Sequence, residues 1–173
     1  MNLLPKKLAA VLLAAAVAGC GGQSQEPRVT ADGFAGVRFG MTVAQAEAAL
    51  GHTLKPTGDV QEGECSFVEP VGAYDGLAFM VIAGVIARLD VQQTTAIATD
   101  TGAKVGDSES RVIDLYKGRT RVEEHQYTGP EGHYVLVLGS DGKAQLVFET
   151  DAGKVVSYRA GRQPEVEWVE GCS

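Results

Sequence analysis

Two histidines lie near several acidic side chains, a combination that can bind a metal ion or move protons. His125 and His133 flank a predicted turn at Pro130. Three glutamates are close in sequence, namely Glu123, Glu124 and Glu131. A His/Glu metal site or an acid–base pair is one interpretation. The other is a set of polar side chains on the solvent face of a hairpin. We favour the second and predict no metal and no cofactor, because no H-E-x-x-H or similar spacing fixes a ligand geometry.

The remaining residues that could catalyse a reaction have simpler structural explanations. None of Ser66, Ser108 and Ser157 has the sequence context of a nucleophile elbow. Asp75 and Asp90 would suit a glycosidase-like carboxylate pair only with a geometry that the sequence does not define. Trp168 and Tyr158 would form a sugar-stacking platform if adjacent, but we expect the C-terminal segment to pack on a sheet instead. We therefore predict that the protein is not an enzyme.

A different chemistry is indicated at Cys20. Two lysines, a short apolar stretch from Leu8 to Val17, and Val17-Ala18-Gly19 precede this cysteine. The apolar stretch is too short to span a bilayer but fits the core of a signal peptide. Residues 1–19 with Cys20 resemble a bacterial lipoprotein signal peptide with its lipobox. This resemblance implies cleavage after Gly19, a diacylglycerol thioether on Cys20 and acylation of the new amino terminus. An ordinary secretory signal is the alternative.

The charge of the chain after residue 19 limits its partners. Two of the 15 Lys+Arg residues lie in the signal segment, which leaves 13 against 22 Asp+Glu, a formal charge of −9. That balance argues against nucleic acid and against adhesion to anionic lipid headgroups. We expect membrane attachment through the lipid on Cys20 alone, with residues 20–33 forming a lipidated cysteine and a flexible tether. By resemblance to lipoprotein sorting, Gly21 favours the outer membrane, with the protein facing the periplasm.

Cys65 and Cys172 remain once Cys20 is acylated. Two thiols in an oxidising compartment are more often paired than free, so we predict a disulfide. It would close a loop of roughly a hundred residues, worth about 4–5 kcal/mol on the chain-entropy model. A zinc pair or a reactive thiol is the alternative, but no Cys-x-x-Cys motif supports it.

Two short helices are predicted from their capping residues. Thr42 with Gln45 forms a capping box before a helix over Val43–Leu50, which Gly51 should end. The segment from Val105 repeats the pattern, with Ser108 as the N-cap and Gly118 as the stop.

Strands are predicted after each helix, in the ranges Cys65–Glu69, Leu77–Ala83, Val85–Gln92, Thr120–Tyr127, His133–Gly139, Ala144–Thr150 and Lys154–Ala160. Ala83-Gly84 is a predicted hairpin turn. Alternation places Leu146, Phe148, Val156 and Tyr158 on one face and leaves a solvated face opposite. The predicted fold class is α+β, with two tandem helix-plus-antiparallel-meander repeats over residues 34–100 and 101–173.

The two capped helices, Gly40-Met41-Thr42 to Gly51 and Gly106-Asp107-Ser108 to Tyr116, resemble those of β-lactamase-inhibitor-protein-like domains and of the small lipoprotein of the outer-membrane assembly machine. The stretches from Leu77, from Val105 and from Pro164 resemble proteobacterial lipoproteins of uncharacterised function. The first resemblance implies a fold, and neither implies an activity.

We therefore expect a non-catalytic envelope lipoprotein that contacts an envelope protein through an open sheet face. Two alternatives remain open. One is an inhibitor of a secreted hydrolase, either a lysozyme or a β-lactamase, since an acidic protein suits cationic lysozymes. The other is a binder of carbohydrate or cell-wall fragments.

Overall fold

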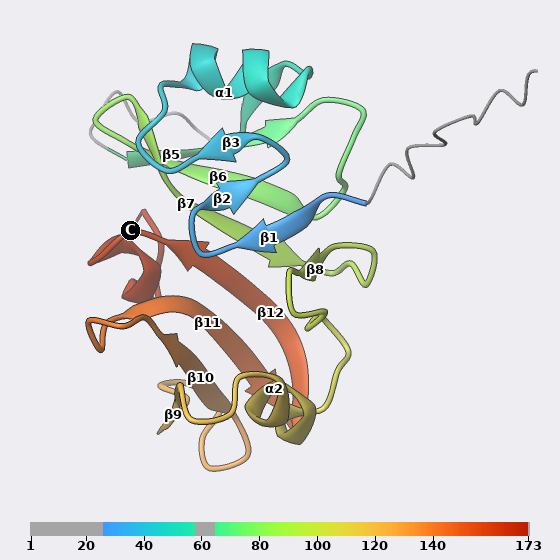
Figure 1. The fold of residues 1–173 in the computed structure, drawn as a ribbon, viewed down its shortest axis with the longest axis vertical. Coiled ribbons are helices and arrows are strands. Elements are labelled where there is room, and N and C mark those ends of the chain that lie inside the picture. The colour runs from blue at the N-terminus through green and yellow to red at the C-terminus, as the bar shows by residue number, and fades with distance from the viewer. Residues whose placement is uncertain (1–25, 58–64, 173) are drawn as a thin grey trace, which may run out of the picture.

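The computed structural model describes residues 26–57 and 65–172 (Figure 1). The predicted signal peptide over residues 1–19, the predicted lipidation site Cys20 and the first part of the predicted tether lie outside the described residues.

An eight-stranded antiparallel sheet forms the body of the molecule. Its spatial order is β4-β5-β6-β7-β12-β11-β10-β9. The strands are β4 (Leu54–Thr57), β5 (Cys65–Pro70), β6 (Leu77–Ile82), β7 (Val85–Gln92), β9 (Thr120–Glu124), β10 (His133–Leu138), β11 (Ala144–Asp151) and β12 (Lys154–Gly161). The pairing of β7 with β12 joins the two halves, with Asp90 opposite Arg159. The predicted Ala83-Gly84 turn is confirmed, since both residues have a positive φ (48° and 79°), as a tight hairpin requires.

Two short helices pack on one face of this sheet. In α1 (Val43–Leu50) the predicted capping box is confirmed, because Gln45 N donates to Thr42 Oγ1 at 3.3 Å and Thr42 N donates to Gln45 Oε1 at 2.9 Å. Gly51 caps the C-terminus in the left-handed conformation, also as predicted. The start of α1 is held against β7 by hydrogen bonds that Gly40 and Met41 exchange with Ile86.

The second helix is shorter than predicted. Ser108 is the N-cap of α2 (Glu109–Leu115), but the helix ends before Gly118. Tyr116 leaves the helical conformation, with φ −110° and ψ 30°, and its side chain is buried, with the hydroxyl donating to Thr99 Oγ1 at 2.9 Å. The buried tyrosine, rather than the glycine, therefore ends this helix.

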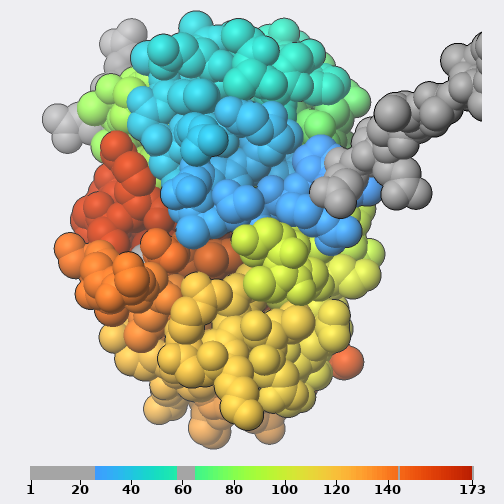
Figure 2. Space-filling view, in the orientation of Figure 1, coloured from blue at the N-terminus to red at the C-terminus, as the bar shows by residue number. Residues whose placement is uncertain are grey.

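A second, smaller sheet lies on the same side as the helices. It has the order β3-β2-β1-β8, with β1 (Arg28–Thr30), β2 (Gly33–Phe34), β3 (Val37–Arg38) and β8 (Ala98–Thr99). Figure 2 shows its blue N-terminal residues between the cyan region of α1 and the yellow region of α2. Residues 28–30, which the sequence places in the tether, thus form a strand that pairs in parallel with β8.

The predicted α+β fold class is wrong. Strands make up 45% of the described structure and helices 13%, with two α-helices and two sheets, so the fold is β-rich and does not consist of helix-plus-meander repeats. The physical reason is that the helices have only eight and seven residues, while strands of two or three residues, which the sequence pattern does not reveal, build the second sheet.

The main core lies between the helices, the small sheet and the large sheet. Phe79, Leu89, Phe148 and Tyr158 are completely or almost completely buried in it. Val156, predicted to share this face, is 46% exposed. The register between β11 and β12 shifts after Glu149, and Val156 has no partner in the register at this bulge, which explains the wrong prediction.

Candidate functional site

The face of the large sheet that is turned away from the helices carries buried charges at its centre. Arg88 and Asp90 project from β7, and both are largely buried. The guanidinium of Arg88 binds the Asp90 carboxylate in a bidentate pair, with Nε–Oδ2 and Nη2–Oδ1 distances of 2.9 Å. On neighbouring strands, Arg159 pairs with Glu149, which also accepts a hydrogen bond from Ser157 Oγ at 3.0 Å. We call this side of the sheet the charged face.

The C-terminal strap, Pro164–Cys172, covers part of the charged face. It begins with a 3₁₀ turn, η1 (Glu165–Glu167), and packs on the sheet. Arg88 Nη1 donates to Glu165 O at 2.8 Å and to Trp168 O at 2.7 Å, and Arg159 Nε donates to Val166 O at 2.7 Å. The buried arginines thus satisfy strap carbonyls that would otherwise lack partners.

Apolar packing supports the same contact. Val166 has no exposed surface and forms a small cluster with Tyr134, Leu136 and Val147, which come from β10 and β11. The strap therefore covers part of the face that was predicted to be solvated.

Cys172, near the other end of the strap, lies beside β5. It is joined to Cys65 by a disulfide, with the two Cα atoms 5.4 Å apart. The neighbouring Gly171 has a positive φ of 65°, and a Cβ on it would meet the Phe67 ring at 3.2 Å. The strap thus crosses from the end of β12 to β5.

Beside the strap, the charged face around Glu69 in β5, Ala78 in β6 and Gln92 in β7 is open and forms a groove of about 530 Å³. Its lining includes Phe67, Glu69, Asp75, Asp90 and Gln92, and no lysine or arginine is among the described residues that line it. We call it the acidic groove. Burial raises the pKa of Asp90, and this effect exceeds the opposing one of Arg88. The backbone at Gly76 approaches Gln92 O so closely that a Cβ there would collide with it, so the edge of the groove requires glycine.

We compared the chain with protein-family models, with curated proteins and with solved structures. None of them matches. In the described residues, no helix is long and apolar enough to cross a membrane. The resemblances drawn from the sequence therefore remain predictions.

The two predicted histidines do not form one site, because they lie on opposite faces of the sheet. His133 Nδ1 is 2.9 Å from Glu109 Oε2 on the helix side. His125 stacks on Tyr134 with ring centroids 4.4 Å apart, and its Nε2 is 4.0 Å from Glu149 on the charged face. Within residues 26–57 and 65–172 no three His, Cys, Asp or Glu side chains are grouped as metal ligands.

The Glu109 carboxylate on the helix side also accepts a hydrogen bond from Thr150 Oγ1 at 2.7 Å. Burial raises the pKa of Glu109, but the hydrogen bonds from Thr150 and His133 outweigh it, and the net result is a lowered pKa. This group therefore connects α2 to the sheet.

The structure separates most of the other candidates. Tyr158 is in the core, with its hydroxyl donating to Ile97 O at 3.2 Å, while Trp168 is 38% exposed on the strap, so they form no stacking platform. Asp75 and Asp90 do line the same groove, but both oxygens of Asp90 already bind Arg88. Ser157 bonds Glu149, and Ser108 caps α2.

Arg88 and Arg159, which organise the charged face, were not predicted as functional residues. A signal was present, because Arg88 and Asp90 alternate with Ala87, Leu89 and Val91 in a largely apolar strand. A charged pair at alternate positions of a buried strand indicates that both faces of the strand are covered.

Proposed function

We propose that this protein is a non-catalytic bacterial envelope lipoprotein, anchored through Cys20 and facing the periplasm, that binds a partner protein in the acidic groove. The observation that supports the proposal most is the unequal covering of the charged face. The strap covers the middle of this face, including Arg88, and leaves a groove of about 530 Å³ open beside it.

The strap illustrates how a polypeptide can bind this face. It contributes one buried valine and three backbone carbonyls that accept hydrogen bonds from Arg88 and Arg159. The groove beside it offers an aromatic ring from Phe67 and carboxylates from Glu69 and Asp75. A partner segment with an apolar anchor and a basic side chain would complement these groups.

The proposal is tested by site-specific photo-crosslinking in intact envelopes. A photoreactive residue replaces Gln92, which is exposed in the groove, and in the control it replaces Val122, which is 44% exposed on β9. We expect a discrete adduct from position 92 that is absent at position 122. The adduct should disappear when Glu69→Lys and Asp75→Lys are introduced together, because they reverse the charge of the groove.

The same adduct pattern at both positions, or an adduct at position 92 that survives the charge reversal, would contradict the proposal. Replacement of Cys20 by Ser should release the protein from the membrane fraction. Persistence of the variant in that fraction would contradict the lipid anchor without bearing on the groove.

Inhibition of a secreted hydrolase is a second candidate, favoured by the same acidic lining, since a cationic lysozyme is attracted by such a groove. A lysozyme turbidity assay tests it. Inhibition by the protein that is lost with Glu69→Lys and Asp75→Lys would identify the partner as a lysozyme, and absence of inhibition would remove this candidate.

A further inference from the structure

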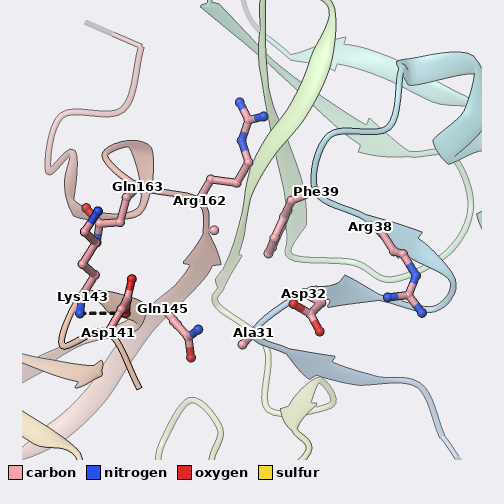
Figure 3. A pocket seen from close by; sticks show the side chains of 10 residues that line it. Ala31, Asp32, Arg38, Phe39, Asp141, Lys143, Gln145, Arg162 and Gln163 are labelled. Carbon is pink, nitrogen blue, oxygen red and sulfur yellow. Dashed lines mark hydrogen bonds between the residues drawn. The ribbon is translucent and has the colours of Figure 1, made fainter. Parts of the chain in front are cut away.

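A cleft of about 490 Å³ lies on another part of the molecule, between the small sheet and the ends of β11 and β12 (Figure 3). One wall is formed by residues 31, 32, 38 and 39, and the other by residues 141, 143, 145 and 161–163. Both walls are held by backbone hydrogen bonds, from Phe39 N to Asp32 O at 3.1 Å and from Arg162 N to Ala87 O at 2.9 Å. The cleft is therefore formed by fixed segments and none of its lining belongs to the acidic groove.

Three side chains with different chemistry point into the cleft in Figure 3, namely Phe39, Asp32 and Gln145. Phe39 is half-buried and packs partly on the main core. Within the part of the chain that the structure describes, the side chains of Asp32 and Gln145 have no hydrogen-bond or ion-pair partner. An ionised carboxylate only accepts hydrogen bonds, whereas an amide both donates and accepts.

Cationic side chains form the rim of the cleft. Arg38, Lys143 and Arg162 are in the lining, in a chain whose formal net charge is −7, and of these Arg162 also pairs with Glu165 at 3.5 Å. Asp141, the other acid in the lining, already accepts a hydrogen bond from the backbone N–H of Lys143 at 3.1 Å. Guanidinium and ammonium groups only donate hydrogen bonds, so the rim favours a ligand that carries an anionic acceptor.

We infer that this cleft binds an acidic saccharide, a pyranose that carries a carboxylate. The ring of Phe39 takes the apolar C–H face of the sugar, and Asp32 and Gln145 bind its hydroxyls. The carboxylate binds the cationic rim. A simple anion would leave Phe39 and Asp32 without a role, and a neutral sugar would leave the rim cations without one.

The inference is tested by NMR titration of the ¹⁵N-labelled protein with two sugars that have the same ring. N-acetylmuramic acid carries a carboxylate, and N-acetylglucosamine does not. We expect the acidic sugar to shift the amide signals of Phe39, Gln145 and Gly161 and to bind about tenfold more tightly than the neutral sugar, the size of one charge-assisted hydrogen bond.

Variants separate the two parts of the site. Asp32→Asn should weaken both sugars, because it changes the group that accepts from the hydroxyls. Lys143→Gln together with Arg38→Gln should remove the preference for the acidic sugar and leave the neutral one unchanged. Arg121→Gln, on β9, is the matched control, since Arg121 pairs with Glu123 at 2.7 Å outside the cleft. It should leave the affinity and the preference unchanged.

Three results would overturn the inference. The first is a dissociation constant for the acidic sugar above about 10 mM, and the second is equal affinity for both sugars. The third is a set of amide signal changes that lies outside the cleft, or that titration with an amino acid such as alanine reproduces. Because the acidic groove does not enter this test, any of these results would leave the proposed protein partner untouched.

Discussion

Replacement of Arg88 by Met tests whether the buried guanidinium holds the strap to the charged face. Methionine retains an unbranched side chain but removes the charge and the donors. Four hydrogen bonds are lost, two to the Asp90 carboxylate and two to the carbonyls of Glu165 and Trp168. The side chain of Arg88 is only 4% exposed and that of Asp90 10%, so water does not readily replace the missing donors.

The expected loss is dominated by the unpaired carboxylate. Removal of one partner from a buried ion pair costs about 3–5 kcal/mol, because the other charge stays buried. For a domain of this size that corresponds to a fall in melting temperature of roughly 10–15 °C. The double variant Arg88→Met with Asp90→Leu removes both charges and should regain most of the loss. The two strap carbonyls would still lack donors, at about 1 kcal/mol each.

Urea unfolding followed by circular dichroism measures these changes. Arg162→Met is the matched control, because Arg162 is exposed and its Nη2 is 3.5 Å from Glu165 Oε1. Such a pair contributes about 0–1 kcal/mol. A loss below about 1 kcal/mol for Arg88→Met, or a double variant no more stable than the single one, would refute the assignment of Arg88 as the buried anchor of the strap.

Three other predictions concern stability. The double variant Cys65→Ser with Cys172→Ser should lower the free energy of unfolding in urea by about 4 kcal/mol. In the parent protein, iodoacetamide should label neither of these cysteines when the protein is unfolded without reduction. Glu109→Gln should destabilise the protein at pH 7. Because the folded-state pKa of Glu109 is lowered, its contribution is present above its ordinary value of 4.5 and is lost as the pH falls through the folded-state value. Melting curves of the variant and the parent should therefore converge in acid, and a constant difference would contradict this. Thr42→Ala should lower the free energy of unfolding by about 1 kcal/mol, because α1 loses its N-cap. Ala48→Gln, at an exposed position of the same helix, is the control. It should change the free energy of unfolding little in the same urea assay, because glutamine is also a good helix former.

Local chemistry made several elements predictable. The capping residues defined the start of both helices, and the alternation of apolar residues between two turn signals placed β7 at Val85–Gln92, as observed. These features depend on residues that are close in sequence. They require no knowledge of which strands are neighbours.

The second sheet could not be predicted in this way. The strands β2, β3 and β8 have two residues each, which is too short to show periodicity, and β1 forms a parallel pair with β8, a distant segment. Their structure depends on tertiary pairing. The bulge that exposes Val156 has the same kind of origin, since it is a property of the register between two strands.

The candidate site was predictable only in part. The sequence contains the residues that line the acidic groove. Two of them, Asp75 and Asp90, were considered together as a glycosidase-like carboxylate pair. The path of the strap cannot be read from the sequence, and it determines which part of the charged face is covered and which part stays open. That outcome depends on two arginines in separate strands meeting the same nine-residue segment.

The junction between β7 and β12 limits how the protein can be divided. These strands come from the middle and the late part of the chain, yet they pair at the centre of the large sheet. A fragment that ended after β7 would present that strand as a bare edge, with unsatisfied backbone groups and an exposed Arg88–Asp90 pair. Such an edge invites pairing with other molecules and hence aggregation. The halves are therefore not separable modules, and a study of either surface requires the chain from β1 to the strap.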